Sequence, residues 1–176
     1  MAYASLDWRS SLMRQPFDSA RGQNVGPPSP MLKSMRPIRD HSVSPDGQWV
    51  VFNETLPQED LFVSRVDGSE YRRLTEDAAR DRGGVWAPNG QMIYFYSDRG
   101  GRYELWRVRP DGLHLEVMSK ESNANFPVVS PDGKRIAYQQ DGTIFVLTLE
   151  TGESTEAVHG LAADWLTDSS LIVMSA

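Results

Sequence analysis

A turn of four residues recurs at a fixed interval, and this repeat constrains the fold more than any other feature of the chain. It reads Ser44-Pro45-Asp46-Gly47, then Ala87-Pro88-Asn89-Gly90, then Ser130-Pro131-Asp132-Gly133. Successive glycines of these turns are 43 residues apart, and a worn copy, Leu166-Thr167-Asp168-Ser169, ends 36 residues after the last glycine. A fixed period of this length is the sequence signature of a repeat architecture.

Each position of the repeated turn has a conformational reason. Proline presets φ for the second position of a type I turn, the Asp or Asn side chain bonds nearby backbone, and glycine takes the left-handed conformation. Such a turn is a common connection between two antiparallel strands. Apolar segments follow the turns, among them Trp49–Phe52 and Met92–Tyr96. The sequence therefore predicts a β-hairpin at each copy.

The order of segments predicts three complete units of four short strands, over residues 37–76, 77–120 and 121–158. Residues 1–36 are expected to supply the outer strands of an incomplete unit, and residues 159–176 the inner strands of another. The second strand of each unit is almost wholly apolar, which in an antiparallel sheet means that both faces are covered. The fourth strands are polar. This gradient favours an all-β propeller of four-stranded antiparallel blades over a sandwich.

The first 36 residues have a proline-rich part. Ser11–Asp18 is expected to be a strand, and Val25–Leu32 can be a strand only at a sheet edge, because its prolines cannot donate ladder hydrogen bonds. The prolines could instead form a polyproline ligand for an aromatic groove. We favour the edge strand, since proline at an edge also protects against aggregation.

The two end segments complement each other. Joined, they would make a fourth blade and close a four-bladed ring. However, Tyr3-Ala4-Ser5 resembles the end of a second strand, as Val173-Met174-Ser175 does, which indicates a window cut from a longer propeller. We therefore expect a partial or open propeller, whose open blade edges could pair with another copy, in preference to a ring closed by the two termini.

The composition argues against several functional classes. With 18 basic and 24 acidic residues the net charge is −6, which argues against a nucleic-acid partner. The absence of cysteine excludes disulfides and cysteine-ligated metals. No apolar run has the length of a membrane span, and residues 1–7 lack the pattern of a secretion signal. The compartment is not indicated.

No catalytic motif stands out, and no cofactor or metal is expected. His41 lies beside Ser42, but the Gly-x-Ser-x-Gly elbow of α/β-hydrolases is missing, so a histidine lining a channel is the favoured interpretation. The loop Asp98–Arg102 lacks a following helix start and is expected to be a solvated hairpin loop. Asp46, Asp132 and the other turn carboxylates are turn formers, since calcium-loop spacing does not occur.

At these residues the chain resembles the TolB-like, WD-like β-propeller repeat family. The copy from Trp86 to Gly112 fits the family pattern throughout, including Ser97-Asp98-Arg99. Two places depart from it: the loop Thr55–Glu59 and the worn last turn, which lacks both proline and glycine. The resemblance implies a non-enzymatic protein-binding or scaffold module. The alternatives are the substrate-gating propeller of a prolyl-oligopeptidase-like serine peptidase, or the sensory propeller of a bacterial kinase or transcriptional regulator.

In such propellers the loops that enter the inner strands surround the mouth of the central channel, and loops on a rigid scaffold commonly carry function. A protein or peptide partner is therefore expected to bind at that mouth. The residues predicted to form it are Asp40, His41, Arg82, Asn123, Asn125 and His159.

Overall fold

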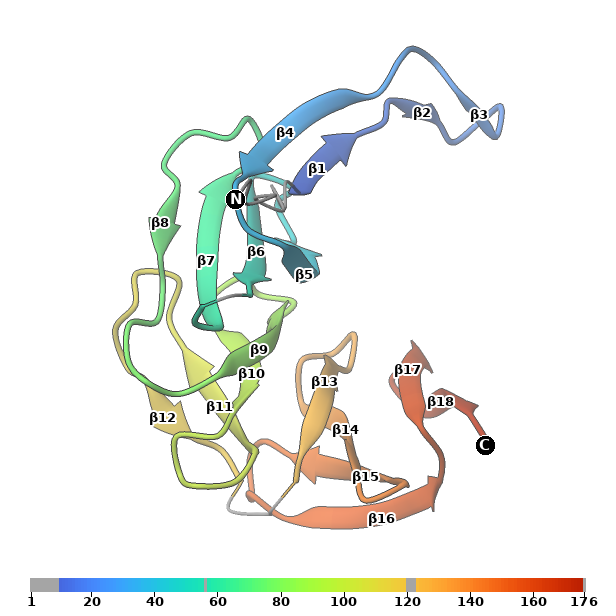
Figure 1. Ribbon diagram of the computed structural model, residues 1–176. Helices are drawn as coiled ribbons and strands as arrows, with labels where there is room; N and C mark the ends of the chain where they lie inside the picture. The colour runs from blue at the N-terminus through green and yellow to red at the C-terminus, as the bar shows by residue number, and fades with distance from the viewer. Residues whose placement is uncertain (1–9, 56, 120–122, 176) are drawn as a thin grey trace, which may run out of the picture.

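The computed structural model describes residues 10–55, 57–119 and 123–175. All the regular secondary structure in these residues is β-strand (Figure 1). The three complete four-stranded sheets are antiparallel, with the orders β5-β6-β7-β8, β9-β10-β11-β12 and β13-β14-β15-β16. We call them blades 1, 2 and 3. The prediction of an all-β structure made of propeller blades is confirmed.

The strands have the following bounds. Blade 1 consists of β5 (Ile38–Val43), β6 (Trp49–Glu54), β7 (Asp60–Arg65) and β8 (Arg72–Arg73). Blade 2 consists of β9 (Asp81–Trp86), β10 (Ile93–Ser97), β11 (Glu104–Val108) and β12 (Glu116–Val117). Blade 3 consists of β13 (Asn125–Val129), β14 (Arg135–Gln140), β15 (Thr143–Thr148) and β16 (Ser154–His159). The end segments contain β1 (Ser10–Arg14), β2 (Phe17–Asp18), β3 (Gln23–Asn24), β4 (Ser29–Ser34), β17 (Ala162–Thr167) and β18 (Ser170–Met174).

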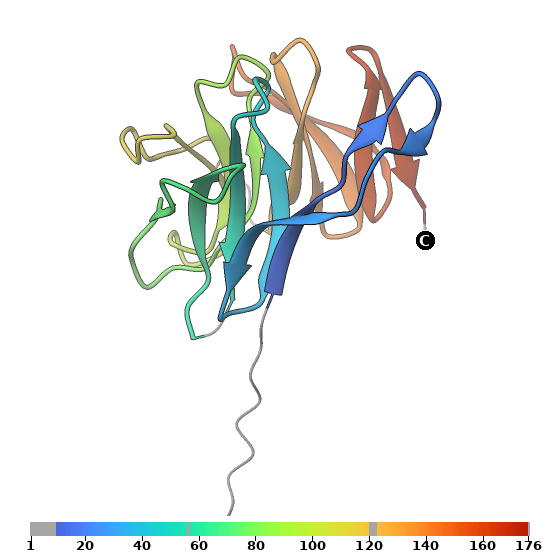
Figure 2. The same ribbon diagram turned by 90° about the horizontal axis from the view of Figure 1, so that it is seen from above.

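The blades are arranged as an open arc. Figure 1 shows the first strands β5, β9, β13 and β17 on its concave side, with the fourth strands β8, β12 and β16 on the outside. In Figure 2 the antiparallel strands of the complete blades lie roughly along one axis, so connections of one kind gather on one face of the arc. This is the radial order that the polarity gradient predicted.

The second strands carry the core. Every residue of β10 is buried, and β6 is buried from its second residue on. One apolar cluster lies at each interface: Val50 and Phe52 face the N-terminal hairpin, Val51 packs with Phe95 between blades 1 and 2, and Tyr96 lies between blades 2 and 3. Because each apolar side chain contributes about 1.5–3 kcal/mol on burial, these interfaces hold the blades in place.

The repeated turns have the predicted conformation. Gly47, Gly90 and Gly133 have φ values of 69°, 70° and 70°. In the first turn the Ser44 hydroxyl donates to the Asp46 carboxylate, which also accepts the backbone N–H of Gln48 at 3.0 Å. The third turn repeats these bonds, whereas Ala87 of the second turn has no hydroxyl to donate.

The ends of the chain confirm one expectation and correct another. The propeller is open, as expected, and is not a ring closed by the two termini, because β1–β4 and β17–β18 are separate two-stranded sheets. The predicted strand Ser11–Asp18 is interrupted at Gln15 and Pro16, and the edge strand begins at Ser29 and not at Val25. Proline is the physical reason, since it cannot donate to a ladder; Pro30 is tolerated because β4 is an outer edge. The expectation about Tyr3-Ala4-Ser5 lies outside the described residues.

The worn fourth turn is tighter than the other three. β17 continues to Thr167 and β18 begins at Ser170, so only Asp168 and Ser169 connect them. Ser169 does not adopt a positive φ. The turn instead docks on its neighbour, because the backbone N–H of Asp132 donates to the Asp168 carboxylate at 2.7 Å.

Candidate functional site

Each blade is a meander, so its connections alternate between the two ends of its strands and lie on opposite faces of the arc. We call the face that carries the repeated turns (residues 44–47, 87–90 and 130–133) the turn end. On the other face, the mouth end, the chain enters β5, β9 and β13 and passes from each second strand to the third. The binding residues predicted from sequence were assigned to the mouth end.

A second periodic feature is found at the mouth end. The first strand of each complete blade has a β-bulge whose residue is left-handed: Asp40 (φ 23°), Gly83 (φ 62°) and Phe126 (φ 52°). These residues are 43 positions apart, like the turns. A bulge re-aims side chains and is over-represented beside functional sites. The side chains of the inner strands therefore change direction at the same position of the repeat in every complete blade.

The side chain of Tyr96 fills the space that the middle bulge leaves open. A Cβ atom added to Gly83 would lie 2.6 Å from the ring carbon Cε1 of Tyr96, so only glycine fits there. The ring of Tyr103 meets Tyr96 at 5.3 Å between centroids and an angle of 75°, and that of Phe126 at 5.6 Å and 66°. Both are edge-to-face contacts, which aromatic rings prefer.

Charged groups surround these rings. The Arg82 guanidinium lies 5.4 Å from the centroid of Tyr103, and its Nε donates to the Glu59 carboxylate. Burial, together with the negative charge of Asp40, raises the pKa of Tyr96 to about 12, although Arg82 opposes the shift. The Tyr96 hydroxyl is therefore a neutral hydrogen-bonding group. We call this set of side chains the Tyr96 cluster; its members are Asp40, Glu59, Arg82, Tyr96, Tyr103 and Phe126.

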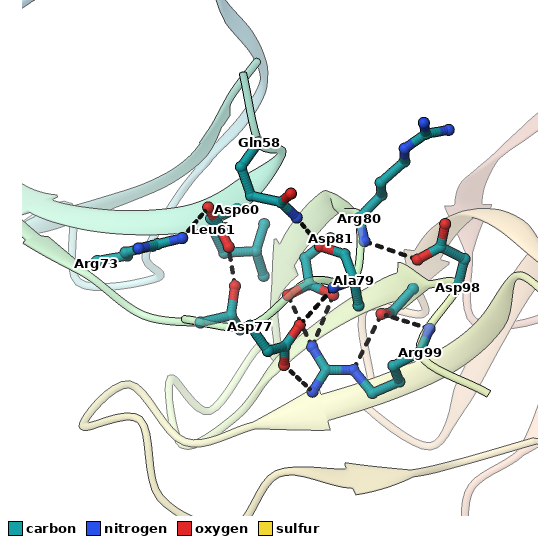
Figure 3. A network of polar contacts seen from close by, with 12 residues as sticks. Gln58, Asp60, Leu61, Arg73, Asp77, Ala79, Arg80, Asp81, Asp98 and Arg99 are labelled. Carbon is teal, nitrogen blue, oxygen red and sulfur yellow. Dashed lines mark hydrogen bonds and ion pairs between the residues drawn. The ribbon is translucent and has the colours of Figure 1, made fainter. Parts of the chain in front are cut away.

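A buried ionic network fixes the loop that leads into β9 (Figure 3). Arg99 donates to both carboxylate oxygens of the fully buried Asp81, at 2.8 and 2.7 Å, and pairs with Asp77 at 3.0 Å. Its guanidinium also lies 4.9 Å from the ring centroid of Trp106. Asp81 directly precedes Arg82 in the chain, so the ion pair between Asp81 and Arg99 also holds Arg82 at the mouth end.

The same network reaches across to blade 1. Arg73 pairs with the buried carboxylate of Asp60, and burial raises the pKa of Asp60 while this ion pair opposes the shift. In Figure 3 the Arg80 side chain points away from the network, although its backbone N–H donates to Asp98 at 2.7 Å. The Gln58 side chain of blade 1 donates to the Ala79 carbonyl, so the loop before β9 is tied to both blades that flank it.

The structure brings together only some of the predicted binding residues. Asp40 and Arg82 are both charged neighbours of Tyr96, whose pKa Asp40 raises and Arg82 lowers. His41 is exposed next to the first bulge. Asn125 Nδ2 donates to the backbone carbonyl of Asn123, and Asn123 Nδ2 donates to Asp141 at 3.1 Å. His159 ends the outer strand β16, where its Nδ1 lies 3.1 Å from the Thr143 hydroxyl, so its environment is an outer ladder.

Four members of the Tyr96 cluster were missed from the sequence: Glu59, Tyr96, Tyr103 and Phe126. The three aromatic residues read as strand or loop residues, and Glu59 lies in a loop that departs from the repeat. The sequence offered one signal for the bulges, since residues 40, 83 and 126 occupy the same position of the repeat, four residues before the first residue of a turn. Gly83 has the residue type that a left-handed conformation favours most, Asp40 has one that tolerates it, and Phe126 has neither.

Other kinds of site find little support. In the described residues no group of three or more His, Cys, Asp or Glu side chains could hold a metal ion. Among those residues no helix is long and apolar enough to cross a membrane. A cavity of about 710 Å³ between blades 1 and 2, lined by Trp49, Trp86 and Arg109, lies at the turn end and is separate from the Tyr96 cluster.

Comparison with known proteins agrees with the propeller blades of the structure. The family described as TolB beta propeller domain matches residues 39–170. An uncharacterized protein of Agrobacterium fabrum is 32% identical over 123 residues, which is 68% of this chain and 42% of that protein. The Tol-Pal system protein TolB of Anaeromyxobacter dehalogenans is 37% identical over 79 residues, 45% of this chain and 18% of that protein.

A solved structure agrees with these relatives. The structure of a putative TolB from Agrobacterium tumefaciens superposes with a TM-score of 0.67 at 26% identity, covering 74% of this chain and 52% of that one. The chain spans less than half of the length of the two curated relatives.

Proposed function

The chain belongs to the TolB β-propeller family, and from this premise we propose that it is a non-enzymatic binding module whose protein or peptide partner docks on the Tyr96 cluster. The blades supply a rigid scaffold, and the connections at the mouth end supply the contact surface. Tyrosine, phenylalanine and arginine are the residue types enriched at protein interfaces and among their binding hot spots.

The observation that carries the proposal is the conformation of Phe126. This residue is left-handed, with a φ of 52°, and its side chain is 54% exposed. A bulky residue held in that region costs about 1–3 kcal/mol, and such strain clusters at functional sites. An exposed aromatic ring gains little from folding, so stability alone does not account for it. Contact between a partner and the Phe126 ring would account for a strained backbone at an exposed residue.

The surroundings of Phe126 fit a protein partner. Its ring stands beside Tyr96, whose neighbours Arg82 and Asp40 supply one charge of each sign. An aromatic anchor with a polar rim is the usual anatomy of a protein interface. The exposed His41 next to the first bulge extends this rim along blade 1.

The test uses peptides selected from a random display library on the immobilised chain of residues 1–176. Phe126→Gly is the test variant, because glycine accepts the left-handed backbone and removes the ring. His114→Gly is the matched control, because His114 is also left-handed (φ 56°) and exposed but lies at the turn end. We expect Phe126→Gly to weaken the selected peptides by about tenfold or more, while His114→Gly leaves their affinity unchanged.

Stability separates a binding effect from misfolding. Relief of the strained φ offsets the lost contact with Tyr96, so the free energy of unfolding of Phe126→Gly should stay within about 1 kcal/mol of the native value. Peptides that bind both variants like the native chain would show that the partner docks elsewhere. Hydrolysis of the peptides by the purified chain would overturn the non-enzymatic part of the proposal.

A further inference from the structure

Two tryptophans line the cavity between blades 1 and 2. Trp49 is the first residue of β6 and Trp86 is the last residue of β9, and both belong to the apolar packing of this interface. The cavity volume of about 710 Å³ lies in the usual range of ligand sites, about 300–1,000 Å³. A second hollow of about 280 Å³ is lined by the same rings and also by Gly90 and Pro110. Because they share these four residues, the two hollows adjoin, and we call them together the Trp groove.

The two rings are not a consequence of the repeat. The counterparts of Trp49 and Trp86 at the interface between blades 2 and 3, one repeat of 43 residues further on, are Met92 and Val129. The aromatic lining is therefore particular to the interface between blades 1 and 2. The Arg65 guanidinium lies 4.3 Å from the centroid of the Trp49 ring, and this cation–π contact helps to hold the ring in position.

Trp86 carries a buried hydrogen-bond donor without an acceptor. The residue is 8% exposed, and its Nε1 has no hydrogen-bond partner in the part of the chain that the structure describes. A buried N–H that is left unpaired gives up its hydrogen bonds to water without compensation, and the large majority of buried polar groups are paired for this reason. The unpaired N–H of a ring that lines a cavity indicates that a ligand supplies the acceptor.

Trp165 provides an internal comparison, because it occupies the same position of the repeat, directly before a turn. Its Nε1 donates to the backbone carbonyl of Val128 in the preceding blade at 3.0 Å. The corresponding carbonyl for Trp86 belongs to Ser42, two repeats before Val128. The Trp86 indole does not bond to it, although the Trp86 backbone N–H lies 3.5 Å from the Ser42 hydroxyl. Trp86 thus lacks the acceptor that its counterpart finds in the neighbouring blade.

The polar groups of the Trp groove indicate the chemistry of the ligand. Several side-chain acceptors in the lining are already used: Asp111 pairs with Arg109 at 3.2 Å, and Asp46 and Asn89 each accept a backbone N–H of their own turn at 3.0 Å. The Trp86 N–H, in contrast, is a free donor within the described residues. A fitting ligand therefore offers carbonyl acceptors and apolar rings but few donors.

We propose that the Trp groove binds a proline-rich segment of a partner protein in the polyproline II conformation, with a carbonyl of that segment accepting the Trp86 N–H. Proline keeps its carbonyl but has no N–H, and its ring is apolar. Proline-rich segments dock in aromatic grooves at a low entropic cost, because their extended helix is formed in advance. A saccharide would instead bring many hydroxyl donors. The groove lies at the turn end, so this proposal does not depend on the Tyr96 cluster.

The test removes the indole N–H and keeps an aromatic ring. A fluorescein-labelled decaproline peptide is titrated with the chain of residues 1–176, and its fluorescence anisotropy is measured. We expect saturable binding to the native chain and binding weaker by about fivefold or more to Trp86→Phe. Trp106→Phe is the matched control, because Trp106 Nε1 is also without a partner in the described residues but Trp106 does not line the groove. It should leave the affinity unchanged.

Further arms separate the site and the class of ligand. Phe126→Gly should bind decaproline like the native chain, which distinguishes the Trp groove from the mouth end. A Gly-Ser peptide of equal length should not bind, and maltohexaose should not displace decaproline. No binding of decaproline, equal weakening by the two tryptophan variants, or displacement by maltohexaose would overturn the proposal, and the last result would show a saccharide site.

Nuclear magnetic resonance of the native chain gives a measurement that needs no stable variant in the binding step. The chain has five tryptophans, so five indole N–H signals are expected, and the signal missing from Trp86→Phe identifies Trp86. Decaproline should shift the Trp86 signal downfield as the hydrogen bond forms, while the Trp165 signal stays in place because its N–H is already bonded. An unmoved Trp86 signal at saturating peptide would contradict the proposed hydrogen bond.

Discussion

The turn end and the mouth end of the same blades are built on opposite principles. At the turn end the three repeated turns satisfy themselves, with a glycine in the left-handed position and an Asp or Asn side chain that bonds its own turn. At the mouth end the left-handed positions hold Asp40, Gly83 and Phe126, and side chains of three blades interlock around Tyr96. The turn end repeats both its backbone and its side chains, whereas the mouth end repeats the backbone bulge but carries a different side chain in each blade.

The difference teaches where sequence variation is tolerated in a repeat fold. A turn that satisfies its own hydrogen bonds can be copied from blade to blade, because it needs nothing from its neighbours. The mouth end depends on contacts between blades, so each blade contributes a different side chain there. A change at the mouth end should therefore cost more stability than the matching change at the turn end.

The largest expected effect concerns two arginines. Arg99→Met leaves the fully buried Asp81 without its partner, which should lower the free energy of unfolding by about 3–5 kcal/mol. Arg109→Met at the turn end removes an exposed pair with Asp111 and should cost at most about 1 kcal/mol. Urea unfolding of both variants measures the difference, and equal losses would remove the contrast between the two ends.

A smaller effect is expected from two left-handed glycines. Gly83→Ala adds the backbone strain of about 1–2 kcal/mol and also drives a methyl group into the Tyr96 ring, for a total loss of about 2–4 kcal/mol. Gly90→Ala adds only the strain, because its nearest neighbour outside the turn, a Pro45 ring carbon, is 3.9 Å away. Thermal unfolding should show the larger loss for Gly83→Ala. The opposite order would mean that the Tyr96 ring moves aside freely.

The smallest effect is a difference in the response to acid. The serine hydroxyls and the backbone N–H groups of their turns lower the pKa of Asp46 and of Asp132. A carboxylate whose pKa is lower in the folded state stabilises the protein above its unfolded pKa, near 4, and loses that contribution as the pH falls through the folded pKa. Between about pH 6 and pH 3, the melting temperature of an Asp46→Asn/Asp132→Asn variant should thus fall less than that of the native chain.

The mouth end should respond to acid with the opposite sign. Burial raises the pKa of Asp60, so the folded state takes up a proton more readily than the unfolded state there, and this group favours folding as the pH falls. An Asp60→Asn variant lacks that contribution, and its melting temperature should drop more steeply in acid than that of the native chain. Parallel curves for all the variants would show that these carboxylates titrate alike in both states.

The blades could be predicted because their signals are local. Proline, Asp and glycine at fixed turn positions impose backbone angles that the residue types prefer by themselves, and the apolar second strands predict covered faces. The worn turn shows the limit of such signals. Leu166-Thr167-Asp168-Ser169 aligned with the other copies, yet without proline and glycine it closed as a tighter hairpin, supported by the neighbouring turn.

The candidate site could be predicted only in part. Placing Asp40 and Arg82 at the mouth end required no more than the order of the strands. Tyr96 and Tyr103 could not be recognised, because they read as ordinary strand residues until the bulge at Gly83 is known. His159 was assigned by analogy to a first strand, but the ladder of blade 3 extends one residue further and includes it in β16.

The sequence by itself determined the repeating unit, the antiparallel order of its strands and the conformation of its turns, because each of these depends on neighbours in the chain. The tertiary structure decided that Phe126 is left-handed, that one tyrosine joins three blades, and that the two end sheets stay apart. These features depend on packing between residues far apart in the sequence, where a ring from one blade fills the space that a bulge in another leaves open.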